Sequence, residues 1–293
     1  MELQPQKPRE TRFSPGRAWQ AIRPEESQRL SDSRQQLHHA AQFAAAAGIS
    51  FLDPQPDDSH TNLEWVPGLS GLFSRVIPAG TMFRIGVIPA ELSLVIAIEN
   101  DQPFARHRLH GRTIVEAVEW IRMHISSLGA ESSRYTLKRD YDIPNHDVDM
   151  GEAFDASDQS AFEQLSTWIA NGASVLNAFV RRMPEASEIR CWPHHFDIAA
   201  LLPLPMDRTI GVGLEPGDDY YDEPYFYVKM DPAPTAAQAR SRPLWGLGTW
   251  HTREWVGAVL PGSRLGPATA QEQQVREFID SAVSACRGLA TLS

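Results

Sequence analysis

The fold of this chain is most clearly indicated by residues 189–202, which have the sequence IRCWPHHFDIAALL. The apolar end of this stretch, residues 198–202, has the length and composition of a buried strand. Two imidazoles and a carboxylate, from His194, His195 and Asp197, precede that end. Because buried polar groups need partners or a purpose, we predict that this strand carries a polar site.

Side chains of an extended chain alternate between two faces. His195 and Asp197 are therefore expected on one face of the strand, about 7 Å apart by the strand rise. Trp192, His194 and Phe196 would point to the other face. The pair on the first face would form half of a polar site.

Helices and further strands are predicted on both sides of this stretch. A long helix is expected over 158–183, with Asp158 as its N-cap. Strands are expected at 209–214 and 225–230, followed by a terminal helix around 275–283.

The preceding part of the chain predicts the same order of elements. A helix over 32–48 and another from Thr113 enclose a meander of short strands. These strands are expected at 63–66, 72–77, 82–88 and 92–99.

Two short motifs recur about 126 residues apart. The first is Trp65-Val66-Pro67, matched by Trp192-Pro193. The second is Arg84-Ile85-Gly86-Val87, matched by Thr209-Ile210-Gly211-Val212. The chain is therefore predicted to be an α+β protein of two similar halves, an internal duplication, with antiparallel sheets flanked by helices.

The predicted halves differ in their polar content. Gly68-Leu69-Ser70 follows the first Trp-Val-Pro, whereas the second half has His194-His195-Phe196-Asp197 at that place. The candidate site is therefore assigned to the second half, and the first half is a scaffold or one wall of a shared cleft. The expected division is a loosely ordered arm over 1–28, halves over 29–130 and 158–293, and a linker over 131–157.

Composition narrows the functional classes. The 293 residues include 27 Lys and Arg against 37 Asp and Glu, a formal charge of −10, which argues against a nucleic-acid partner. No apolar run approaches the roughly 20 residues of a membrane span, and the first thirty residues do not resemble a secretory signal. Cys191 and Cys286 are too few for a disulfide framework. We expect a cytoplasmic protein without a membrane partner, and the sequence does not indicate an oligomeric state.

Two versions of a small-molecule enzyme follow from the polar stretch. In the first, His195, Asp197, Glu223 and His251 bind a divalent transition metal, because imidazole and carboxylate suit Zn, Fe, Mn and Ni. In the second, Asp197 orients His195 or His194 for acid/base catalysis without a metal. The ligand would then lie against aromatic side chains. These are Tyr225, Tyr227, Trp250 and Trp255.

Two further interpretations remain open. The chain could be a non-catalytic binding or protein-interaction module with an aromatic-lined pocket. Alternatively, the histidines and Asp197 could serve only to satisfy backbone groups at a bend. The glycines of Gly211-x-Gly213-x-x-x-Gly217 do not indicate a phosphate loop, because they lie in a predicted strand and lead into an acidic turn.

Several segments resemble a bacterial family known only as a domain of unknown function. They include residues 143–154, the long helix, Phe196-Asp197-Ile198-Ala199 and Pro224-Tyr225-Phe226-Tyr227. The resemblance covers about half of the chain and implies a role for Asp197. It implies no reaction.

Overall fold

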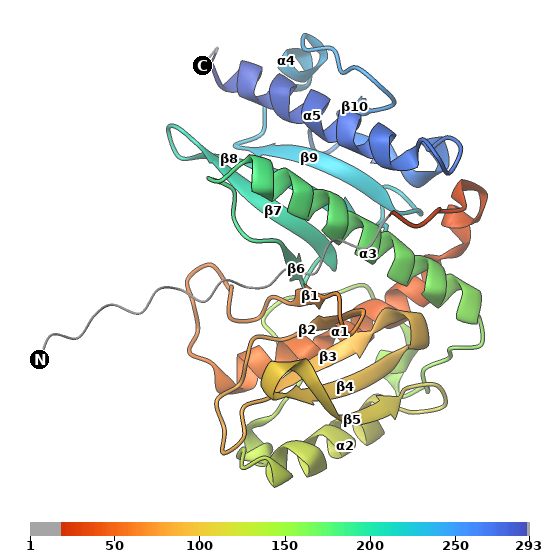
Figure 1. Cartoon of the computed structure of the whole chain (residues 1–293), viewed down its shortest axis with the longest axis vertical. Helices are drawn as coiled ribbons and strands as arrows, with labels where there is room; N and C mark the ends of the chain where they lie inside the picture. The colour runs from red at the N-terminus through yellow and green to blue at the C-terminus, as the bar shows by residue number, and fades with distance from the viewer. Residues whose placement is uncertain (1–18, 292–293) are drawn as a thin grey trace, which may run out of the picture.

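The computed structural model describes residues 19–291 and has an α+β architecture with two antiparallel sheets (Figure 1). The first half begins with helix α1 (Ser31–Phe51) and ends with α2 (Ile114–Ser127). Between them lie β1 (Glu64–Val66), β2 (Gly71–Phe73), β3 (Arg84–Ile88), β4 (Ser93–Ile98) and β5 (Gln102–Arg108). Both helices and the four predicted strands are confirmed, and β5 is an additional edge strand.

The second half begins with helix α3 (Gln159–Arg182), and Asp158 caps it by accepting a 3.1 Å hydrogen bond from the amide of Ala161. The strands are β6 (Arg190–Trp192), β7 (Asp197–Leu204), β8 (Arg208–Glu215), β9 (Tyr225–Asp231), β10 (Thr249–His251) and β11 (Gly257–Pro261). Two helices complete it, α4 (Ala236–Arg240) and α5 (Gln271–Ala290). The sequence did not predict α4, β10 or β11, because they are short and lie in a segment rich in Gly and Pro, a composition typical of loops.

Short 3₁₀ helices connect several of these elements. They lie at Pro24–Arg29, Pro89–Glu91, Glu99–Asp101, Ser132–Arg134, Asp147–Met150 and Gly262–Arg264.

The two sheets meet edge to edge in the middle of the molecule (Figure 1). The strand order is β1-β2-β3-β4-β5 in one sheet and β10-β11-β9-β8-β7-β6 in the other. At the meeting point, Leu63 and Cys191 exchange backbone hydrogen bonds of 2.9 and 2.8 Å. Both residues are buried, so the seam between the halves is part of the core.

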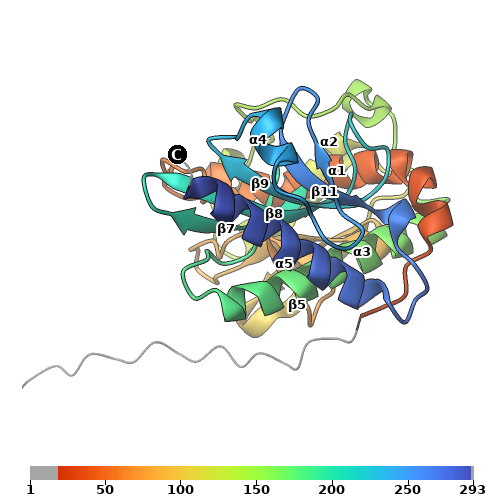
Figure 2. The ribbon, with the colours of Figure 1, turned by 90° about the horizontal axis from the view of Figure 1, so that it is seen from above.

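Helices α3 and α5 lie side by side on one face of the second sheet, as both views show (Figures 1 and 2). The side chains of Ile198, Leu214 and Phe226 belong to this face, because these residues occupy matched register positions on β7, β8 and β9 and join the core. Asp197, Glu215 and the odd-numbered residues of β9 therefore belong to the opposite face. We call this opposite face the open face.

The predicted strand over 189–202 is wrong in its middle. Residues 193–196 form a turn between β6 and β7, closed by a 2.7 Å hydrogen bond from the amide of Phe196 to the carbonyl of Trp192. Phe196 has a left-handed backbone (φ 66°), and Pro193 has no amide for a strand ladder. His195 and Asp197 consequently do not share one face of a strand.

The predicted N-terminal arm over 1–28 differs from the structure where it can be compared. Residues 1–18 lie outside the described residues. Residues 19–28 are tied to the second half, because the Gln271 side chain accepts a 3.0 Å hydrogen bond from the amide of Ile22 and donates one to its carbonyl. Asn171 in α3 holds the backbone of Gln20 in the same way. The side chains that order this segment come from distant helices, so its own composition did not indicate them.

The predicted duplication stays a prediction. Both halves begin and end with a helix, and the matched motifs fall on the first and third strands of each half, β1 with β6 and β3 with β8. No helix within residues 19–291 has the length and apolarity that a membrane span requires. Cys191 and Cys286 are both free and buried.

Candidate acid/base site

Helix α1 of the first half presents a polar stripe to the second half. Arg34, His38 and Gln42 are four residues apart and therefore lie on one side of the helix. The side chains of His38 and Gln42 each donate a 2.8 Å hydrogen bond to the carbonyl of Pro193, and the His38 ring stacks on Phe196 at 5.3 Å between centroids. The stripe fixes the turn that leads into β7.

Burial lowers the pKa of His38 from 6.5 to about 3. The imidazole is therefore neutral near pH 7. Its Nε2 carries the hydrogen, because the carbonyl of Pro193 can only accept. The hydrogen bond to Pro193 favours the charged form, but the loss of hydration outweighs it.

Asp197 is buried on the open face at the start of β7, with 6% of its surface exposed. The Tyr227 hydroxyl donates a hydrogen bond to its Oδ2 atom. Its Oδ1 atom is fully buried and has no hydrogen-bond partner among the described residues. Burial raises the pKa of the Asp197 carboxyl, and the Tyr227 hydrogen bond opposes that shift.

Glu215, at the end of β8, is a second buried carboxyl beside Asp197. Burial raises the pKa of Glu215, and the nearby carboxyls of Asp197 and Asp218 raise it further. The Arg34 guanidinium acts in the opposite direction and is the weakest of these influences. We call Asp197 and Glu215 the carboxyl pair. Because their charges repel each other and lack hydration, the pair tends to retain a proton.

Two of the glycines in Gly211-x-Gly213-x-x-x-Gly217 are required by this site. A Cβ atom on Gly213 would lie 2.5 Å from Cζ of Tyr227, so the ring can reach Asp197 only over a residue without a side chain. Gly217 has φ 123°, and a Cβ atom there would lie 2.1 Å from the Arg34 guanidinium. Gly213 and Gly217 therefore serve close packing at this site.

Aromatic rings continue from Tyr227 across the open face to β10. Neighbouring centroids are 6.4 Å apart for Tyr227 and Tyr225, 4.7 Å for Tyr225 and Tyr221, 5.6 Å for Tyr221 and His251, and 4.3 Å for His251 and Trp255. We call these five rings the aromatic array. The Tyr225 hydroxyl donates a 2.8 Å hydrogen bond to Asp218. The array therefore links the partly exposed Trp255 with the buried carboxyl pair.

Three of the four predicted aromatic ligands belong to this array, and Trp250 does not. Trp250 pairs with Ala258 on the opposite, helix-covered face of the sheet, and its indole nitrogen donates a 2.7 Å hydrogen bond to the carbonyl of Arg242. The sequence did not predict strand β10. It therefore did not indicate that Trp250 and His251, as neighbours on a strand, lie on opposite faces of the sheet.

The predicted histidines lie at the rim of this site. His195 is exposed and His194 is half-buried, and their rings are 4.3 Å apart. His195 acts electrostatically on Asp197. It makes no hydrogen bond to that carboxyl, since Oδ2 accepts from Tyr227 and Oδ1 has no partner among the described residues. Asp197 therefore does not orient a histidine through a hydrogen bond in this structure, although the sequence had predicted that it would.

The four predicted metal ligands are not brought together. Within residues 19–291 no group of three or more His, Cys, Asp or Glu side chains has an arrangement that could hold a metal ion. The Glu223 carboxylate instead accepts hydrogen bonds of 2.6 and 2.8 Å from the amide and hydroxyl of Ser263. His251 donates from Nε2 to the carbonyl of Arg253 and accepts from the Tyr221 hydroxyl at Nδ1. Both side chains are thus engaged in holding loops.

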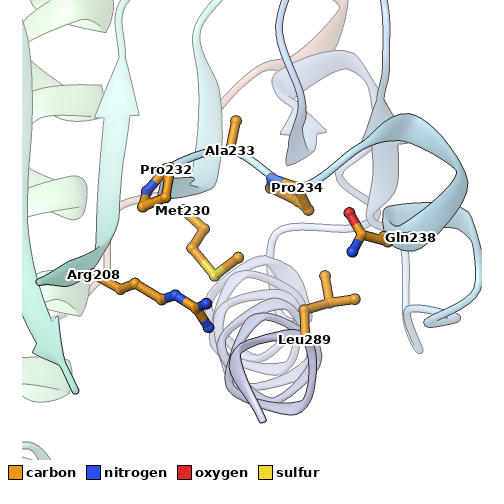
Figure 3. Close-up of a pocket in the computed structure, with 7 residues that line it drawn as sticks. All are labelled: Arg208, Met230, Pro232, Ala233, Pro234, Gln238 and Leu289. Atoms are coloured by element: carbon orange, nitrogen blue, oxygen red, sulfur yellow. The ribbon is translucent and has the colours of Figure 1, made fainter. Parts of the chain in front are cut away.

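Two small cavities in the described residues lie away from the carboxyl pair. The larger holds about 100 Å³ between the end of β9, α4 and α5 (Figure 3). Its lining residues are Arg208, Met230, Pro232, Ala233, Pro234, Gln238 and Leu289. The Arg208 guanidinium donates a 2.8 Å hydrogen bond to the carbonyl of Ala290, which ties β8 to the end of α5.

The chain matches no model of a known protein family, no curated protein and no solved structure. The candidate site therefore depends on the geometry of this chain alone.

The sequence did not identify Glu215, Arg34 or His38 as members of the site. Glu215 had one available signal, since it continues the alternation of Gly211 and Gly213 on β8 and so shares their face. No pattern in the sequence indicated Arg34 or His38, because they come from the other half of the chain.

Replacing Glu215 with Gln is expected to reduce the loss of stability at alkaline pH. The raised pKa of Glu215 contributes stability below the unfolded-state pKa, and this is lost as pH rises through the folded-state value. Gln has a similar shape and does not ionise. In urea unfolding at about pH 6 and pH 9, wild type should lose more free energy than E215Q. The exposed Glu277→Gln change is the control, and equal losses in wild type and E215Q would contradict the prediction.

Proposed function

We propose that this chain is a cytoplasmic small-molecule enzyme that uses Asp197 as a general acid/base. The observation that supports this proposal is the state of Asp197, a buried carboxyl with a raised pKa and one oxygen without a partner. Catalytic carboxyls are tuned in this way, because a pKa nearer to neutrality allows both uptake and release of a proton.

Each neighbour of Asp197 has a defined part in such a proton transfer. Oδ1, which has no partner among the described residues, would take a proton from a substrate that displaces the atoms now burying it, and would return the proton at another position. The Tyr227 hydroxyl, hydrogen-bonded to Oδ2, stabilises the carboxylate form. Burial raises the pKa of Tyr227, so this hydroxyl keeps its proton. Glu215 disfavours ionisation of both members of the pair at once and so biases Asp197 toward the acid form.

A substrate-independent assay tests the proposal. Purified protein is incubated with a mixed cytoplasmic metabolite extract, and each compound is followed by mass spectrometry. Wild type should deplete one compound with appearance of a product, and Asp197→Asn should slow this at least about 100-fold, the usual contribution of a general acid/base. Asp207→Asn, at an exposed turn between β7 and β8, is the matched control and should keep the wild-type rate. Equal rates in wild type and Asp197→Asn would rule out the assigned role.

The aromatic array supports a second candidate, a binding protein without chemistry. Aromatic rings that run from a partly exposed to a buried position offer contact area for a ligand. In the same assay, a compound retained by the protein and recovered unchanged would favour this candidate.

A further inference from the structure

We infer that the carboxyl pair and the aromatic array together form a binding site for an organic ammonium ion. This inference rests on the proposed function, since it assigns a substrate class to the same site. Three independent features carry it: the charge of the site, the free oxygen of Asp197, and the aromatic rings beside it.

Negative groups outnumber positive ones where the strands β7, β8 and β9 meet. The carboxyls of Asp197 and Asp218 both act on Glu215, and Arg34 is the cation that acts on Glu215. Lys229 and His195 are the positive groups that act on Asp197. Arg34 also lies 3.8 Å from Asp222. An incoming ammonium group would offset the repulsion between the carboxyls, and it would let the carboxyl pair ionise.

Asp197 offers an ammonium group a hydrogen-bond acceptor. Its Oδ1 is buried and has no partner among residues 19–291, while Oδ2 is already occupied by Tyr227. An unpaired buried oxygen costs free energy that an N–H donor would recover, and the bond is stronger when the donor is charged.

The aromatic array suits the organic part of such an ion. The rings of Tyr227 and Tyr225 adjoin the carboxyl pair, and the rings of Tyr221, His251 and Trp255 continue outward. Faces of tyrosine and tryptophan attract cations, and their area also contacts alkyl or aryl groups.

The ligand is expected to approach over the open face. Beyond Tyr227, which is partly exposed, this face has Gly211 without a side chain and the exposed Leu201 and Lys229. Lys229 carries positive charge toward Asp197, so the ammonium group should be oriented toward the other side, where Glu215 lies.

Three probes of one shape and different charge test the inference. Benzylammonium, neutral benzyl alcohol and benzoate are titrated into the whole protein by calorimetry at physiological salt. Benzylammonium should bind, and the other two should not. Asp197→Asn should weaken binding at least about tenfold, through loss of a charge-assisted hydrogen bond. Asp219→Asn, an exposed change in the same acidic loop, should leave the affinity unchanged.

Proton release gives a second readout that folding defects do not imitate. An ammonium ion that drives ionisation of the carboxyl pair must release protons, so the apparent binding enthalpy should differ between phosphate and Tris buffers. Tyr227→Phe removes the hydrogen bond to Oδ2 but keeps Asp197 and the aromatic ring, so it should weaken benzylammonium binding less than Asp197→Asn does. Thermal unfolding of each variant confirms that it is folded.

Several results would overturn the inference. They are absence of benzylammonium binding, equal binding of benzyl alcohol, or equal weakening by Asp219→Asn, which would indicate attraction to the acidic loop alone. If benzylammonium fails to bind but Asp197→Asn still abolishes turnover in the metabolite assay, the substrate class is wrong and the proposed acid/base function stands. If turnover is also unaffected, both are wrong.

Discussion

The protein is expected to lose stability steeply on acidification, and His38 should account for a large part of the loss. Burial holds the pKa of His38 at about 3 in the folded state, against 6.5 for an accessible histidine. Between these values the unfolded chain binds one more proton at this residue, so stability falls as pH decreases. The expected slope approaches 1.4 kcal/mol per pH unit, and the total is at most about 5 kcal/mol.

Replacing His38 with Gln isolates this contribution. Gln places an N–H group near the position of Nε2, which can still donate to the carbonyl of Pro193, and it does not titrate. Urea unfolding measured from about pH 7 to pH 4 should show a shallower acid dependence for H38Q than for wild type. His60→Gln, in the loop before β1, is the control and should keep the wild-type slope. Parallel curves for wild type and H38Q would show that the His38 ring is not held neutral in the fold.

Gly213→Ala is expected to destabilise the protein by about 1 to 3 kcal/mol, the usual cost of a side chain added to a filled space. The new methyl group would lie 2.5 Å from Cζ of Tyr227 and 2.6 Å from its hydroxyl oxygen. The ring must then move, and the hydrogen bond to Asp197 is lost with it. Urea unfolding gives the change in stability, and the ammonium titration described above should show weakened binding.

Gly211→Ala is a closely matched control for that change. It lies two residues earlier on the same face of β8, where the nearest atoms to a new Cβ are 3.8 Å away. Because alanine has less conformational freedom to lose than glycine, G211A should be neutral or slightly stabilising. In a Tyr227→Leu background the cost of Gly213→Ala should shrink, since the obstructing ring is gone. A cost that is the same in both backgrounds would mean that Tyr227 is not what excludes a side chain at position 213.

Local patterns in the sequence were sufficient for most helices and strands. Apolar residues at helical spacing predicted α1, α2, α3 and α5, and the cap at Asp158 is confirmed by its hydrogen bond to Ala161. Runs rich in β-branched and aromatic residues predicted β3, β4, β8 and β9, because each buries at least one face along most of its length. Strands β10 and β11 were missed, since short segments in a region rich in Gly and Pro have no pattern strong enough to distinguish them from loops.

The polar stretch before β7 shows where a local pattern misleads. An extended chain through Pro193 and Phe196 would place the side chains of His195 and Asp197 on one face of the strand. A left-handed backbone at Phe196 ends that alternation, and contacts from α1 hold the turn in place. A turn can be stabilised by residues about 150 positions away, and a single sequence does not record such a pairing.

The sequence alone determined the α+β class and the order of the main elements, because these depend on periodicity. It also singled out Asp197, Tyr225 and Tyr227 as candidate site residues, because they are polar residues among apolar ones. The tertiary structure alone decided that Glu215 lies beside Asp197, that Arg34 acts on Glu215 and that His38 holds the turn before β7. It also decided that Glu223 and Trp250 are engaged elsewhere. Strand register and helix placement bring side chains together from distant segments. Burial then shifts their pKa values and so decides which of them are ionised. Both effects depend on neighbours in space rather than in sequence.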